Sequence, residues 1–74
     1  MNSPATETIE IVVNGENRPA PSGLNLHDLL VALGIEPSRV AVELNRKIVS
    51  KAEWNRTTIR SGDGLEIVQF VGGG

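Results

Sequence analysis

The residues with the clearest chemistry are the three glycines that end the sequence, Gly72, Gly73 and Gly74, directly after an apolar segment. Glycine carries no side chain, so its backbone can approach another surface closely and adopt angles that other residues avoid. Three extended residues reach about 10 Å, enough to enter a narrow slot in an enzyme. The reactive group of such a tail is its α-carboxylate, which is ionised at neutral pH. We therefore expect residues 72–74 to form an exposed tail that presents the Gly74 carboxylate.

The remaining polar residues suggest little chemistry of their own. The sequence holds one histidine, His27, and no cysteine, so a metal site or a catalytic centre is not expected. Asp63 and Glu66 are interpreted as turn and surface residues. No phosphate-loop motif surrounds Gly62 and Gly64, which are therefore interpreted as turn glycines. We predict that the chain binds neither a metal nor a cofactor.

Composition and charge narrow the class of protein. The 74 residues suffice for one small domain, and the net charge of −2 argues against nucleic-acid binding. No run approaches the roughly 20 apolar residues of a membrane span. Residues 1–8 are polar, include Pro4 and lack the apolar core of a signal peptide. We expect a soluble, cytoplasmic protein that is monomeric on its own and contacts no membrane.

The first half of the sequence predicts a β-hairpin followed by a helix. Residues 9–13 alternate in hydrophobicity as a strand does, and Asn14-Gly15 is a strong hairpin signal. The returning strand over residues 16–20 contains Pro19, which suits a sheet edge. A helix should begin after Asn25 as N-cap, with Asp28 near its positive end. Its apolar stripe consists of Leu26, Leu29, Leu30 and Leu33, and Gly34 with Pro37 should end it.

The second half predicts two more strands, one helical turn and a final strand. Residues 40–44 and 47–49 should pair about a turn at Asn45-Arg46. Ser50 and Glu53 fit the capping-box pattern, in which the two side chains cap a helix start, so a short turn carrying Trp54 is expected. The last strand covers residues 65–71.

One fold accommodates this order of elements. A mixed sheet of four or five strands that wraps one helix buries the leucine stripe most simply, and its first and last strands can pair at the centre. This is the α+β arrangement called the β-grasp, or ubiquitin-like, fold. We assign residues 1–8 to a flexible lead, 9–71 to the domain and 72–74 to the tail.

The last strand is expected to carry an exposed apolar pair. If Leu65 and Ile67 face the helix, Val68 and Phe70 face outward, and exposed apolar strips tend to mark contacts. Val12, on the outward face of the first strand, could extend the strip. The alternative is that Phe70 folds over the end of the sheet and covers the core. We predict that Val68, Phe70, Gly72 and Gly73 bind a partner.

Taken together, the chain resembles the ThiS family of sulfur carriers in thiazole (thiamine) biosynthesis, from about Ile9 to Gly74. The resemblance rests on these segments in this order: Val13-Asn14-Gly15, Leu26-His27-Asp28-Leu29-Leu30, Val42-Glu43-Leu44-Asn45, Ile48-Val49, Trp54, Gly62-Asp63 and Phe70-Val71-Gly72-Gly73-Gly74. The polar lead of about eight residues departs from the family, whose members often start at the first strand.

The resemblance implies a role as a protein co-substrate rather than an enzyme. An E1-like, ThiF-type adenylyltransferase would use ATP and Mg²⁺ to adenylate the Gly74 carboxylate. Sulfur from a cysteine-derived persulfide would then replace AMP, giving a 1-thioglycine that donates sulfur to a ThiG-type thiazole synthase. The chemistry is reasonable, because a carboxylate resists attack by a second anion until adenylation neutralises it and supplies a leaving group.

Two other functions fit the same features of the sequence. The small subunit of molybdopterin synthase shares the fold and the tail, although such chains are usually longer and differ over residues 45–59. A ubiquitin-like module that is conjugated through its tail, or that merely binds a partner, is the third interpretation. The lack of cysteine excludes the ferredoxins that share this fold.

Overall fold

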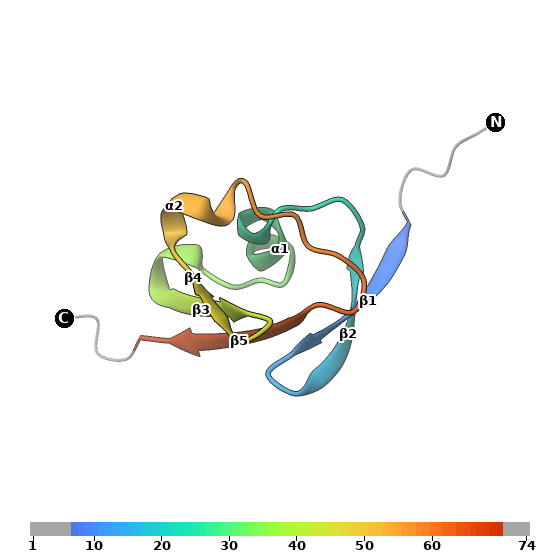
Figure 1. The fold of residues 1–74 in the computed structure, drawn as a ribbon, viewed down its shortest axis with the longest axis horizontal. Coiled ribbons are helices and arrows are strands. Elements are labelled where there is room, and N and C mark those ends of the chain that lie inside the picture. The colour runs from blue at the N-terminus through green and yellow to red at the C-terminus, as the bar shows by residue number, and fades with distance from the viewer. Residues whose placement is uncertain (1–6, 71–74) are drawn as a thin grey trace.

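The computed structural model describes residues 7–70, and its elements follow the predicted order (Figure 1). They are β1 (Thr8–Val13), β2 (Glu16–Pro21), α1 (Leu26–Ala32), the 3₁₀ helix η1 (Pro37–Arg39), β3 (Val40–Leu44), β4 (Lys47–Val49), α2 (Lys51–Trp54) and β5 (Gly64–Gln69). β1 begins at Thr8, which the sequence placed in the flexible lead. β5 ends at Gln69, so Phe70, which the sequence placed in this strand, lies just beyond it, and the predicted end at Val71 lies outside the described residues.

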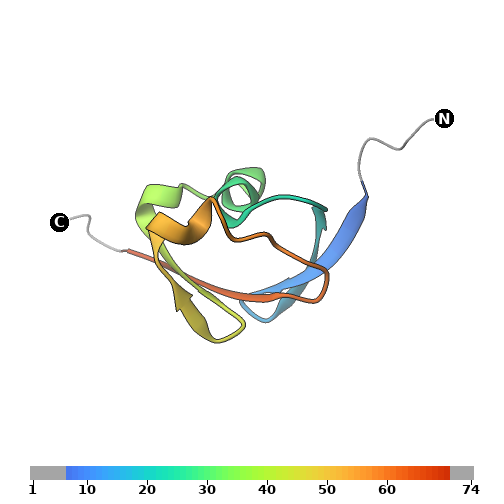
Figure 2. The ribbon, with the colours of Figure 1, turned by 45° about the horizontal axis from the view of Figure 1, so that its top comes forward.

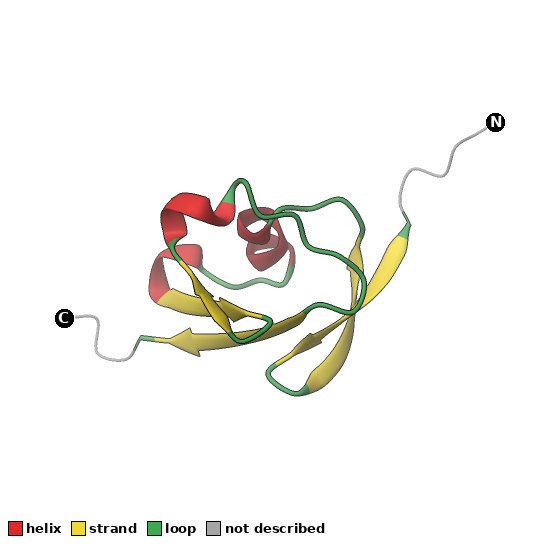
Figure 3. Ribbon diagram, viewed as in Figure 1, coloured by secondary structure: helices red, strands yellow, loops and turns green. Residues whose placement is uncertain are grey.

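The five strands form one mixed sheet in the order β2-β1-β5-β3-β4. β1 and β5 run parallel at the centre, and the other neighbours are antiparallel. Both α-helices lie on one side of this sheet, with α1 across its concave face (Figures 2 and 3). The predicted β-grasp fold is confirmed.

Turn residues with positive φ close both hairpins. Asn14 and Gly15 have φ values of 51° and 85°, and Asn45 and Arg46 have values of 51° and 73°. Two successive residues in this region give the turn whose twist matches that of paired strands. β2, which contains Pro19 and Pro21, is an edge strand, as expected for residues that cannot donate a backbone hydrogen bond.

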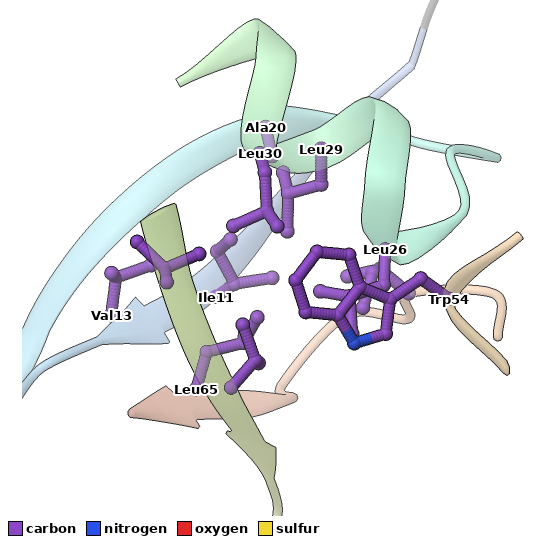
Figure 4. Packing of buried hydrophobic residues seen from close by; sticks show 11 residues of the cluster. Ile11, Val13, Ala20, Leu26, Leu29, Leu30, Trp54 and Leu65 are labelled. Atoms are coloured by element: carbon purple, nitrogen blue, oxygen red, sulfur yellow. The ribbon is translucent and has the colours of Figure 1, made fainter. Parts of the chain in front are cut away.

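The core lies between the sheet and α1. Leu26, Leu29 and Leu30 are 0% exposed, and they pack over strand residues such as Ile11 and Leu65 (Figure 4). The whole cluster consists of Ile11, Val13, Ala20, Leu26, Leu29, Leu30, Val40, Val42, Trp54, Ile59 and Leu65. The buried indole of Trp54 donates its Nε1–H to the Val49 carbonyl at 2.9 Å, so its polar atom is satisfied.

Asn25 caps α1 as predicted. Its Oδ1 accepts a hydrogen bond of 2.7 Å from the Asp28 N–H, one of the donors that a helix start leaves unpaired.

We expect Asn25→Ala to lower the free energy of unfolding by about 1 kcal/mol, measured by urea denaturation. Asn55→Ala, at the exposed C-cap of α2, is the control, and an equal loss there would contradict the assignment.

The capping box predicted for α2 is wrong in its side chains. Ser50 is the N-cap, but its hydroxyl makes no capping hydrogen bond. The helix is a single turn, and the Glu53 N–H is already taken by the Ser50 carbonyl at 2.9 Å. The Glu53 carboxylate instead pairs with Arg56 at 3.1 Å.

Within residues 7–70, no helix has the length and apolar character needed to cross a membrane.

Candidate functional site

The site is built around the end of β5, which leads toward the C-terminal glycines. β5 has β1 on one side and β3 on the other, so the chain approaches its end from the middle of the sheet (Figure 1). Phe70 is the last described residue. The predicted tail residues Gly72, Gly73 and Gly74 lie outside the described residues, so the geometry that follows is that of the strand from which they continue.

From Leu65 to Val68, side chains alternate along β5 as the sequence predicts, while Phe70 lies just beyond the strand. Leu65 is buried and Ile67 packs against the core, while Val68 is 61% exposed and Phe70 52% exposed. Phe70 does not belong to the buried cluster. Val68 and Phe70 are therefore accessible near the end of the described residues, and their role in binding a partner stays a prediction.

The exposed apolar surface extends from β5 across β3 to β4. A shallow hollow of about 130 Å³ is lined by Ala41, Val42, Glu43, Ile48, Glu66 and Val68. Ile48, in β4, is 80% exposed beside this hollow. Val12, expected on the same outward face, is half-buried. The hollow is lined in part by the outward face of β5.

A lysine lies over the ring of Phe70. Lys51 Nζ is 5.7 Å from the Phe70 ring centroid and 5.8 Å from that of Trp54. The same Nζ donates a hydrogen bond of 3.3 Å to the Ser38 carbonyl. A cation at this distance is attracted to the face of an aromatic ring. Lys51 therefore links the end of β5 to α2 and to η1.

Two turn asparagines hold β5 at different points. Asn14 Oδ1 accepts from the Ile67 N–H at 2.7 Å, and its Nδ2 donates to the Ile67 carbonyl at 3.2 Å. Asn45 Oδ1 accepts from the Gly64 N–H at 2.9 Å. Asn45 Nδ2 also donates to Asp63 Oδ1 at 3.0 Å. The two hairpin turns thus contact β5 near its end and at its start.

Of the other polar residues considered from the sequence, only Glu66 lies at this site, where it lines the hollow. His27 Nδ1 lies 3.2 Å from its neighbour Asp28 Oδ1, and Asp63 accepts from the Arg60 N–H at 2.7 Å within its own turn. Glu66 is exposed on the outward face of β5. Among residues 7–70, no group of three or more His, Cys, Asp or Glu side chains could hold a metal ion.

Sequence reasoning missed Asn14 and Lys51 at this site. Asn14 was interpreted as a turn residue, and its bond to Ile67 spans 53 residues of sequence. Lys51 carries no signal in the sequence, because an exposed lysine in a short helix is ordinary. Both residues become visible once the strand order is known.

Comparison with known proteins identifies the family. The family model described as "ThiS family" matches residues 7–74. The chain belongs to the ThiS family. This assignment covers the domain and the three terminal glycines, and it agrees with the resemblance seen in the sequence.

The relatives of this ThiS-family chain include both much longer proteins and proteins of similar length. A thiazole synthase of Paramagnetospirillum magneticum is 41% identical over 66 residues, which are 89% of this chain and 20% of that protein. The chain thus spans about one fifth of the length of such relatives. The sulfur carrier protein ThiS of Thermus thermophilus is 37% identical over 84% of this chain and 95% of its own length.

A solved structure agrees with the fold. The crystal structure of the thiamine biosynthesis protein ThiS from Geobacter metallireducens superposes with a TM-score of 0.78 at 33% identity. The match covers 89% of this chain and 100% of that one. The β-grasp fold and membership of the family therefore rest on both sequence and structure.

Proposed function

We propose that this chain is a sulfur carrier whose Gly74 carboxylate is converted to a thiocarboxylate that donates sulfur to a thiazole synthase. The observation that supports this most directly is that the family match extends to Gly74. The accessible Val68 and Phe70 at the end of β5 give an activating enzyme a surface to bind beside the tail.

The proposed chemistry takes place in two stages. In the first, the Gly74 carboxylate attacks the α-phosphorus of ATP, giving an acyl adenylate and releasing pyrophosphate in an E1-like, ThiF-type enzyme. In the second, the terminal sulfur of a cysteine persulfide attacks the acyl carbon and AMP leaves with one former carboxylate oxygen. A second thiol then cleaves the sulfur–sulfur bond, and its oxidation to a disulfide leaves the thiocarboxylate on Gly74. ATP and Mg²⁺ bind to the partner.

Relatives named thiazole synthase support the choice of acceptor. In the Paramagnetospirillum magneticum protein, a segment 41% identical to this chain forms part of the same polypeptide. A carrier joined to its acceptor has a high effective concentration at the acceptor site, so such an arrangement suits a donor and the enzyme it serves. We propose that this chain serves the same class of enzyme, and that it does so in the cytoplasm, where ATP is available.

Intact-mass spectrometry after reaction with a ThiF-type enzyme, ATP and a persulfide donor tests the proposal. We expect one oxygen to be replaced by sulfur, but oxidation of Met1 or Trp54 changes the mass almost equally. The chain has no cysteine, so a thiol-specific alkylating reagent should label the thiocarboxylate and nothing else. Absence of any alkylated product would contradict the proposal.

Genetic rescue tests the acceptor separately. We expect the chain to restore growth of a bacterium that lacks its own thiazole sulfur carrier on medium without thiamine. A strain lacking the small subunit of molybdopterin synthase is the control, and it should not recover. Rescue of the control strain alone would contradict thiazole synthase as the acceptor while leaving the carrier chemistry intact.

A further inference from the structure

We propose that Asn14 is a positioning residue that fixes the direction in which the chain leaves the sheet toward its C-terminal carboxylate. The inference rests on the proposed function, in which an activating enzyme must receive that carboxylate. It concerns the side of β5 that faces β1, where backbone pairing stops before β5 ends.

Backbone pairing extends further along β5 on the side of β3 than on the side of β1. On the β3 side, pairing continues to Gln69, opposite Val40, and the Phe70 N–H then donates to the Arg39 carbonyl at 2.8 Å. On the β1 side, the last residue pair is Val13 with Leu65, because the chain turns away at Asn14. Without a further contact, β5 would lack a neighbour on this side from Ile67 onward.

The Asn14 side chain takes the place of the missing strand. Its Oδ1 accepts from the Ile67 N–H at 2.7 Å and its Nδ2 donates to the Ile67 carbonyl at 3.2 Å. A paired strand offers the same two groups, a carbonyl and an N–H. Both backbone groups of Ile67 are therefore held, three residues before the last described residue.

The choice of asparagine at this position has two physical reasons. The turn needs a positive φ, which is 51° at Asn14, and glycine, asparagine or aspartate could provide it. Of these three, asparagine alone has a carboxamide that supplies both a donor and an acceptor. The turn conformation thus explains why the residue is glycine, asparagine or aspartate. The contact with Ile67 explains why it is asparagine.

Loss of this contact should act on binding rather than on chemistry. If the end of β5 moves, the fraction of molecules that direct the tail correctly falls, and apparent affinity for the enzyme falls by the same fraction. Once the carboxylate is in place, its reaction with ATP is unchanged. Such a change raises KM and leaves kcat constant.

Asn14→Gly removes the carboxamide and still permits the positive φ. The assay follows pyrophosphate release by a ThiF-type enzyme. We expect the KM of this enzyme for the chain to rise about three- to tenfold, with kcat unchanged. Asn45→Gly is the matched control, because Asn45 has the same φ of 51° and bonds β5 at Gly64 instead. It should leave KM unchanged. Asn14→Asp keeps an acceptor for the Ile67 N–H and should give an intermediate KM.

A second measurement needs no partner enzyme. We expect amide hydrogen exchange at Ile67 and ¹⁵N relaxation at Gln69 and Phe70 to show greater motion in Asn14→Gly than in Asn45→Gly. This result stands even if the chain proves not to carry sulfur. Equal effects of the two glycine variants on exchange and on KM, or an unchanged KM in Asn14→Gly, would overturn the inference. If Asn14→Gly does not fold, Asn14→Asp is compared with Asn45→Asp instead.

Discussion

A chain lacking Gly73 and Gly74 should fold as the full chain does and gain no sulfur. Within the described residues, the buried cluster lies between Ile11 and Leu65 in the sequence, and we expect the deletion to leave this cluster intact. It shortens the reach of the tail by about 7 Å, which leaves the new terminal carboxylate outside the site where ATP reacts. We expect an unchanged melting temperature by circular dichroism and complete loss of the alkylated product described above.

A matched deletion at the other end serves as the control. Removing Asn2 and Ser3 takes away two residues of the polar lead, and this variant should gain sulfur like the full chain. Sulfur transfer to the shortened tail would contradict the need for its full length. A drop of several degrees in the melting temperature of the chain that lacks Gly73 and Gly74 would mean that the terminal glycines stabilise the domain.

Leu30→Ala should have the largest effect on stability. Leu30 is 0% exposed and packs between α1 and the sheet (Figure 4). Truncating a fully buried leucine costs about 2–5 kcal/mol, which is a large part of the total stability of so small a domain. We expect the melting temperature to fall by about 8 °C or more, and urea denaturation should give the loss in free energy.

Val31→Ala, at the next position of the same helix, separates packing from helix propensity. Val31 is 55% exposed, and alanine favours the helix more than valine does. This variant should be as stable as the parent or slightly more so. Equal losses in the two variants would contradict the placement of Leu30 in the core.

Much of the fold could be predicted because its turns, caps and edge strand depend on interactions between residues that are close in sequence. The turn at Asn14-Gly15, the Asn25 cap and Pro19 on the edge strand each depend on residues close in sequence. The leucine stripe of α1 needs a sheet to cover it, and few arrangements of these elements provide one. Periodicity alone placed Val68 on the outward face of β5.

The parts that were missed depend on long-range contacts or on competition between groups. Asn14 reaches Ile67 through a turn that any residue tolerant of positive φ could form, so no local pattern predicts the bond. The Ser50 cap was wrong because a backbone carbonyl occupies the N–H that the hydroxyl was expected to bond. The 3₁₀ helix η1 starts at Pro37, a residue that we expected only to prevent the preceding helix from resuming after Gly34.

The central position of β5 has a mechanical consequence. An enzyme that draws the terminal residues into a deep slot exerts traction along β5. β3 is antiparallel to β5 over five residue pairs. A force along β5 therefore acts parallel to both strands, and the hydrogen bonds between them share it instead of breaking one after another. If an enzyme binds the terminal residues as we propose, we expect the whole β3–β5 ladder to share the load along β5.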